Sequence, residues 1–283
     1  MTLQFDLALL ILLAAFAHAA WNALVKASGD PLLTFTMLRA VALAGGAIGA
    51  LLVPLPGASA WPFLIASALV HNVYYLLLLY SYRHGDLSLV YPIARGGAPV
   101  LVLGAAIPFV GELPGPLGLL GVALISAGIF AIAFARGIPK GADVAAIALA
   151  AGTTVAIVAY TLIDGLGARR SGDAPAYAAW LFILESPPFL VFAAATRARA
   201  FVAHARRAWR PGLVGGLMMM LTYALVIYAF TQGPLAYVSA LRETSILFAA
   251  LIGWVGLKES FGPRRIAASA VIVAGILLLQ LGG

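Results

Sequence analysis

Polar side chains recur at intervals of four residues inside a stretch of the chain that is otherwise apolar. His18, Asn22 and Lys26 form this series within the run Leu7–Ala27, and Trp21 lies beside it. Residues four apart share one face of an α-helix, so the spacing predicts a polar stripe along one side of a helix. Polar groups in an apolar segment are costly, which makes Trp21 and Asn22 candidates for binding a solute.

Tyrosines and a histidine form a second candidate set in other apolar stretches. His71 and Tyr75 share a helix face by their spacing, as do Tyr160 and Asp164, and Tyr223 stands in a later apolar stretch. Their rings could enclose the apolar part of a small solute. Ordinary packing is the alternative explanation for the tyrosines. Asp164 is close to a loop, and we expect it to be exposed to water.

Two arginines occupy apolar stretches of their own. Arg95 lies within Tyr91-Pro92-Ile93-Ala94-Arg95-Gly96-Gly97-Ala98-Pro99, and Arg242 follows Ser239 at a similar depth. Each proline removes a backbone donor, so the first of these segments predicts a broken helix. A guanidinium at such depth either binds free backbone carbonyls or recognises a substrate carboxylate. Tyr91, Arg95, Ser239 and Arg242 are therefore candidate binding residues.

The composition places all these residues in a membrane protein. Hydrophobic residues make up 63% of the 283-residue chain and charged residues only 10%, which is too little polar surface for a water-soluble globule. The formal charge of +7 comes from Lys and Arg in short loops, as topology-setting charges do, and does not indicate nucleic acid binding. Cysteine is absent, so disulfides and thiolate metal sites are excluded.

Ten apolar segments have the length of about 20 residues that a membrane-spanning helix needs. The predicted spans are Leu7–Ala27, Pro31–Val53, Ala60–Tyr82, Leu87–Val110, Pro114–Ala135, Val144–Gly165, Ala174–Thr196, Gly212–Gln232, Leu235–Leu257 and Pro263–Leu281. Between the seventh and eighth, Phe201–Trp209 alternates apolar residues with histidine and arginine and predicts a short helix on the cytoplasmic lipid surface.

The second half of the chain repeats the first. At an offset of 148 residues, Tyr75 and Gly85 recur as Tyr223 and Gly233. At an offset of 147 residues the pairs are Arg95 and Arg242, Glu112 and Glu259, Gly115 and Gly262, Pro116 and Pro263, and Gly128 and Gly275. We predict an all-α integral membrane protein in which residues 1–139 and 140–283 form two five-helix repeats. An odd number of crossings per repeat inverts the second copy relative to the first.

Enzyme motifs are missing from the sequence. It contains no HExxH, GxSxG or P-loop pattern, and no cysteine cluster. We expect neither an enzyme nor a bound cofactor or metal.

The repeated motifs resemble those of the EamA type of the drug/metabolite transporter superfamily. They are Tyr91-Pro92-Ile93-Ala94-Arg95, Gly111-Glu112-Leu113-Pro114-Gly115-Pro116 and Lys258-Glu259-Ser260-Phe261-Gly262-Pro263, in register in both halves. The resemblance implies an exporter of small metabolites in the bacterial inner membrane, working by alternating access around a central cavity. The aromatic residues are similar to the branch that exports amino acids, including aromatic ones.

The site expected from the residues and this resemblance encloses the substrate with aromatic rings and binds its polar end. The candidate residues are Trp21, Asn22, His71, Tyr75, Tyr91, Arg95, Tyr160, Tyr223, Ser239 and Arg242. Expected partners are amino acids or aromatic metabolites and membrane lipid, with the chain acting as a monomer. The alternatives are a passive channel, a non-transporting membrane scaffold, or an exporter of drugs or other metabolites.

Acidic residues inside the spans determine whether transport could be coupled to a proton gradient. Glu185 and Glu243 are the only ones well inside a predicted span, and the first span has no carboxylate beyond Asp6 at its end. Glu243 is explained as a counter-ion to a neighbouring arginine, and Glu185 as part of a hydrogen-bonded turn before two prolines. We therefore expect facilitated transport that is insensitive to a pH gradient.

Loop charges predict the orientation in the membrane. Loops on the side of the chain ends hold only Arg169 and Arg170, whereas the remaining loops hold most of the Lys and Arg residues, so both ends should be periplasmic. A reporter that is active only in the cytoplasm should be inactive after Gly283 and active after Arg136, which lies in an opposite loop. The reverse pattern would overturn this orientation and leave the fold untouched.

Overall fold

The computed structural model describes residues 4–84, 87–134, 144–257 and 262–281, without the side chains of residues 78–79, 81–94, 133, 144–147, 253 and 255–257. The described residues form helices and no β-strand. The elements are α1 (Phe5–Ala27), α2 (Pro31–Leu52), the 3₁₀ turn η1 (Ala58–Ala60), α3 (Trp61–His84), α4 (Leu87–Val110), α5 (Pro116–Ala133), α6 (Val144–Ser171), α7 (Ala174–Glu185), α8 (Pro187–Gln232), α9 (Leu235–Glu243), α10 (Ser245–Leu257) and α11 (Pro263–Leu281).

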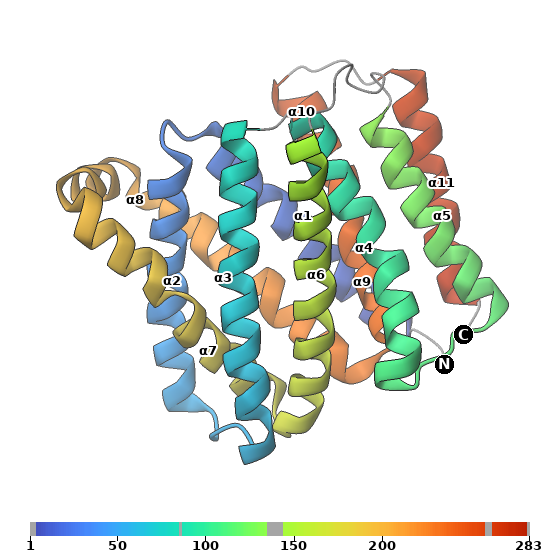
Figure 1. Cartoon of the computed structure of the whole chain (residues 1–283), viewed down its shortest axis with the longest axis horizontal. Helices are drawn as coiled ribbons and strands as arrows, with labels where there is room; N and C mark the ends of the chain where they lie inside the picture. The colour runs from blue at the N-terminus through green and yellow to red at the C-terminus, as the bar shows by residue number, and fades with distance from the viewer. Residues whose placement is uncertain (1–3, 85–86, 135–143, 258–261, 282–283) are drawn as a thin grey trace.

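Length and composition suit these helices to a membrane. Within the described ranges, seven are long and apolar enough to cross one, and two shorter apolar segments, Arg95–Val110 and Pro116–Ile132, belong to α4 and α5. Both ends of the chain lie at the same end of the bundle (Figure 1), which fits an even number of crossings. The total of ten crossings and the division into two repeats remain predictions.

The helices pack around an interior that several of them share. α5 and α11 lie side by side at one edge of the bundle, and α2, α7 and α8 pack together at the other (Figure 1). α6 contacts α3 and α4, while α1 contacts α8, α9 and α10. Candidate residues that are far apart in the sequence therefore face one interior.

Two predicted spans are interrupted, each at a residue whose side-chain hydroxyl donates to a backbone carbonyl. The predicted seventh span divides into α7 and the start of α8 at Ser186, whose hydroxyl donates to the Phe182 carbonyl at 2.6 Å. The ninth divides into α9 and α10 at Thr244, whose hydroxyl donates to the Leu241 carbonyl at 2.6 Å. A hydroxyl that bonds a nearby carbonyl competes with the helical ladder.

The prediction of a broken fourth span was wrong. α4 runs as one helix through Leu87–Val110, prolines included. The interruption lies instead at Thr244, in the ninth predicted span. Prolines inside a membrane helix are tolerated where neighbouring groups satisfy the carbonyls that they free.

Two kinks divide α8, which runs for 46 residues. The backbone leaves the helical region at Arg197 (φ −141°, ψ 28°) and at Ala208 (φ −113°, ψ 24°). The predicted surface helix Phe201–Trp209 coincides with the segment between them. An ion pair of 2.6 Å from Arg197 to Asp30 ties that segment to the start of α2. Partial burial would raise the pKa of the Asp30 carboxyl, but the Leu33 N–H and the Arg197 guanidinium outweigh it and hold that pKa below its ordinary value.

Small residues bring the backbones of α5 and α11 into contact. A Cβ atom added at Gly275 would lie 2.8 Å from the Gly121 carbonyl oxygen, and one at Gly128 would lie 2.9 Å from the Ala268 carbonyl oxygen. The 147-residue offset places Gly128 at Gly275 and Gly121 at Ala268, so the same offset relates the two contacts, as the predicted repeat requires. Close approach of this kind drives helix association in lipid, where hydrophobicity cannot.

The Gly275→Ala substitution should lower the stability of the protein by about 1–3 kcal/mol, because the added methyl group meets backbone atoms that cannot move aside. Gly104→Ala is the matched control, since a Cβ at this helical glycine of α4 meets nothing within 4 Å. Thermal unfolding in detergent should show a lower midpoint for Gly275→Ala and an unchanged or higher one for Gly104→Ala. Equal midpoints would show that the α5–α11 contact does not contribute to stability.

Candidate functional site

An interior cleft is lined by side chains from α1, α2, α3, α4, α6, α7, α8 and α9. Its volume is about 520 Å³, including the open space at its mouth. The lining combines aromatic rings with three arginines and one glutamate, so the cleft has an apolar wall and a charged wall.

The cleft brings together most of the candidate residues. Seven of them line it: Trp21, His71, Tyr75, Arg95, Tyr160, Tyr223 and Arg242. Asn22 is not among the lining residues, and its amide donates to the His18 carbonyl of its own helix at 2.8 Å. Ser239 is fully buried away from the cleft. Tyr91 belongs to α4, but its side chain lies outside the described part of the chain.

The aromatic wall is a chain of ring contacts. His71 stacks on Tyr160 with centroids 4.2 Å apart, and Tyr223 meets the His71 ring edge-on at 5.1 Å. Tyr75 lies 6.1 Å from His71 and 4.7 Å from Phe35. Rings in such offset and edge-on arrangements attract one another beyond simple burial. The wall therefore links α2, α3, α6 and α8 and presents ring surfaces to the cleft.

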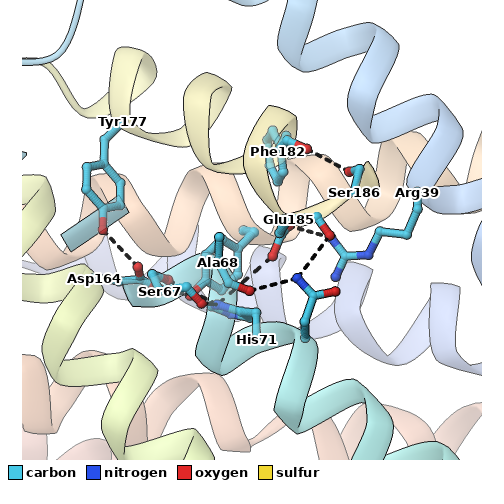
Figure 2. A network of polar contacts seen from close by, with 11 residues as sticks. Arg39, Ser67, Ala68, His71, Asp164, Tyr177, Phe182, Glu185 and Ser186 are labelled. Atoms are coloured by element: carbon cyan, nitrogen blue, oxygen red, sulfur yellow. Dashed lines mark hydrogen bonds and ion pairs between the residues drawn. The ribbon is translucent and has the colours of Figure 1, made fainter. Parts of the chain in front are cut away.

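A buried ion pair forms the first part of the charged wall. Arg39 of α2 donates to Glu185 at the end of α7 (Figure 2), and the two side chains are 1% and 3% exposed. The Arg39 guanidinium also lies 4.3 Å from the Tyr75 ring centroid. Sequence reasoning missed Arg39, although it is the only charged residue of the run Pro31–Val53. It also assigned Glu185 to a local turn, which the pairing with another helix corrects.

The Arg39–Glu185 pair leaves hydrogen-bonding capacity unused. Among the described residues, Arg39 Nε and Nη2 and Glu185 Oε2 have no hydrogen-bond partner, although all three atoms are buried. Buried polar atoms without a partner cost about 1–3 kcal/mol each, more when charged. Both residues line the cleft. The pair thus offers a ligand two adjacent N–H donors and one carboxylate acceptor.

A second charged cluster contains Arg95 and Arg242, the two arginines that the 147-residue offset pairs in the sequence. Glu243, fully buried, accepts from Arg95 at 2.8 Å and from Arg242 at 3.0 Å. Arg95 also contacts His18, and Arg242 donates to Thr161 at 3.4 Å. Glu243 is thus a counter-ion, as expected, and it serves both arginines. One carboxylate offsets one of the two guanidinium charges, so the cluster lends positive potential to the cleft.

A third buried acid, Asp164, was expected to be exposed, and that expectation was wrong. Asp164 has no exposed surface, and it accepts hydrogen bonds from Tyr177 at 3.0 Å and from Tyr223. Ser67 lies beside it (Figure 2), and the Ser67 hydroxyl is 3.1 Å from His71 Nδ1. α7 and α8 cover the part of α6 that the sequence suggested was near water. A carboxylate therefore lies behind the aromatic wall of the cleft.

A polar contact outside the cleft joins segments of the two halves. Glu112, in the connection before α5, accepts from Arg169 at 2.7 Å and from the Leu235 N–H of α9 at 2.7 Å. Arg169 also donates to the Phe230 carbonyl at 2.8 Å. These bonds connect the end of α6 and the start of α9 to the first half of the chain. In the described part of the chain, no group of three or more His, Cys, Asp or Glu residues is placed to bind a metal.

Comparisons with known proteins agree with this architecture. Residues 144–281 match the family model described as the EamA-like transporter family. A solved structure described only as the crystal structure of a protein superposes with a TM-score of 0.74 over 97% of this chain and 95% of that chain, at 16% sequence identity. No curated protein matches the sequence. The apolar helices and the family match together identify a multi-pass membrane protein.

The cleft should be reachable by small aqueous reagents. Thr222→Cys places a thiol in the cleft lining, and Thr154→Cys places one in a buried position of α6 that is not part of the lining. The control is matched, because each threonine hydroxyl bonds the carbonyl four residues earlier at 2.8 Å. In a chain without cysteine, Thr222→Cys should react with a methanethiosulfonate reagent at least about tenfold faster. Equal rates would show that the cleft is closed to water.

Proposed function

We propose that this chain is a membrane transporter that exports small metabolites, among them amino acids with aromatic side chains, by alternating access around the cleft. The EamA-like match of residues 144–281 supports the transporter class. The enclosed cleft supports binding of a small solute, because it combines ring surfaces with a few charged groups in an apolar surround.

The unused atoms of Arg39 and Glu185 are the observation that carries the substrate class. Nε and Nη2 of one guanidinium form the edge that binds a carboxylate through two parallel hydrogen bonds. Neither atom of Arg39 has a hydrogen-bond partner, while its Nη1 atom donates to Glu185 and its guanidinium lies against the Tyr75 ring. Glu185 Oε2 is free to accept from an ammonium group. The α-carboxylate and α-ammonium of an amino acid are adjacent charges of these two signs, and they complement the pair.

The aromatic wall supports an apolar or aromatic side chain on that amino acid. His71 Nδ1 lies 4.0 Å from Glu185 Oε2, so the stacked rings of His71 and Tyr160 begin next to the proposed position of the ammonium group. Trp21 and Tyr223 also line the cleft. A ring bound there would replace water against π surfaces, which suits aromatic residues better than charged ones. Arg95 and Arg242 would add attraction for the carboxylate.

Repeat-related contacts support movement of two halves around the site. With Asp30 aligned to Asp173, both of which cap a following helix, His18 of α1 matches Thr161 of α6. His18 contacts Arg95 and Thr161 contacts Arg242, so each arginine meets the equivalent position of its own half. Two inverted halves with equivalent contacts can exchange conformations. The bonds of Glu112 to α6 and α9 support a carrier rather than a passive channel, since they join the halves at one end.

Proteoliposomes preloaded with labelled phenylalanine should exchange it for external phenylalanine in preference to 3-phenylpropionate, which lacks the ammonium group. Glu185→Gln should reduce this preference at least about tenfold, because a hydrogen bond between charged groups contributes about 1.5–3 kcal/mol. Glu112→Gln removes a buried, ion-paired glutamate outside the cleft and should leave the preference unchanged. Intact protein that exchanges no amino acid would overturn the proposed substrate class.

A further inference from the structure

The buried acids of the site differ in how their charge is compensated. Glu185 is paired with Arg39, and Glu243 is paired with Arg95 and Arg242. Among the residues whose side chains are described, no arginine or lysine lies within ion-pair distance of Asp164. Its hydrogen-bond donors are the neutral hydroxyls of Tyr177, Tyr223 and Ser67, and His71 is the one side chain acting on it that can carry a positive charge. Protonating Asp164 therefore breaks no ion pair, whereas protonating either glutamate leaves a buried guanidinium without its anion.

The surroundings of Asp164 connect it to the cleft. α7 contributes Tyr177 and α8 contributes Tyr223, while α3 contributes Ser67 and His71. α9 presents an apolar side chain to this part of α6, because Leu235 packs against the next residue, Gly165. Tyr223 and His71 also line the cleft, and Tyr177 does not. Tyr223 is thus a residue that both lines the cleft and donates its hydroxyl to Asp164.

With His18 and His71 counted as neutral, the charges of the site balance when Asp164 is ionised and no anion is bound. Three guanidiniums, those of Arg39, Arg95 and Arg242, face three carboxylates, those of Asp164, Glu185 and Glu243. Net charge is costly in a low-dielectric interior. A zwitterion adds no net charge and leaves the balance intact. A carboxylate anion adds one negative charge, which a proton on a carboxylate would cancel.

We propose that Asp164 is a proton-binding site and that it takes up a proton when a carboxylate anion without an ammonium group occupies the cleft. The proton of the Tyr223 hydroxyl passes to Asp164 Oδ2, and a hydronium ion that reaches the Tyr223 oxygen through water in the cleft gives it a new proton and is left as water. At Tyr223 one O–H bond breaks and one forms, at Asp164 Oδ2 one forms, and at the hydronium ion one breaks, so the net change is one proton taken from the aqueous phase. The anion and the proton then cross the membrane together as an electroneutral pair, whereas a zwitterion crosses without a proton.

This inference rests on the proposed function, because it takes the cleft as the substrate site. It also limits the expectation of transport that is indifferent to pH to zwitterionic substrates. That expectation followed from the two glutamates inside the spans and set Asp164 aside as exposed. With Asp164 fully buried, the site has a carboxylate that can change its protonation without breaking an ion pair.

Proton uptake by the detergent-solubilised full chain tests the linkage. In weak buffer near neutral pH with an indicator dye, 3-phenylpropionate should cause uptake of about one proton per bound anion, and phenylalanine close to none. Asp164→Asn keeps oxygen and shape for the tyrosine bonds, and it should bind the anion without uptake. Asp173→Asn, the same change at the residue that caps α7, should behave as the unmodified protein does.

Calorimetry on the same samples measures ligand binding, and binding decides what each proton-uptake result means. Uptake that persists in Asp164→Asn, or anion binding by the unmodified protein without uptake, overturns the proposal. If neither ligand binds, the anion linkage falls together with the proposed substrate class. Infrared titration without ligand then tests the proton site by itself: a protonated-carboxyl band should appear on acidification and be missing only in Asp164→Asn. If the band is unchanged in Asp164→Asn, Asp164 is not the proton-binding site.

Discussion

A buried arginine needs an anion close by, and this requirement organises the centre of the molecule. Charged groups that leave water are tolerated only when each is paired and hydrogen-bonded. Glu243 satisfies the requirement for Arg95 and Arg242 at once, and Glu185 satisfies it for Arg39. Since Arg95 belongs to the first half of the chain and Glu243 to the second, pairing of charge fixes the depth and rotation of α4 against α9. That placement brings Arg95 and Arg242 together in the lining of the cleft.

Two kinds of contact hold the halves together, and they differ in what a ligand can change. α5 and α11 meet backbone to backbone at Gly121 and Gly275, where the atoms touch and no group can exchange partners. The interior is held by ion pairs and ring contacts, whose partners a ligand can replace. Arg39 and Glu185 belong to this second kind and still have unsatisfied atoms. In the proposed transporter, the α5–α11 edge would stay fixed while the contacts of the interior rearrange around a bound solute.

The sequence predicted what depends on periodicity and repetition, and it missed what depends on contacts between distant helices. Apolar length indicated the helices, and the 147-residue offset paired Arg95 with Arg242 before their shared glutamate could be seen. Arg39 was not predicted as a site residue, because it belongs neither to a series of polar residues at four-residue spacing nor to a pair matched by the internal repeat. Asp164 was misjudged because its position along the chain does not reveal that α7 and α8 cover it. Burial of a single side chain is a tertiary property, which local pattern does not determine.

The internal repeat is imperfect where the arginines meet, and the imperfection has an energetic consequence. Arg95 and Arg242 occupy equivalent positions, but Gly96 follows the first and Glu243 follows the second. One carboxylate therefore serves two guanidiniums. If the two halves exchange conformations during transport, the arginines exchange environments, while Glu243 has no counterpart with which to exchange. The two end states would then hold this carboxylate differently, so the free-energy difference between them would depend on Glu243 even though it does not line the cleft.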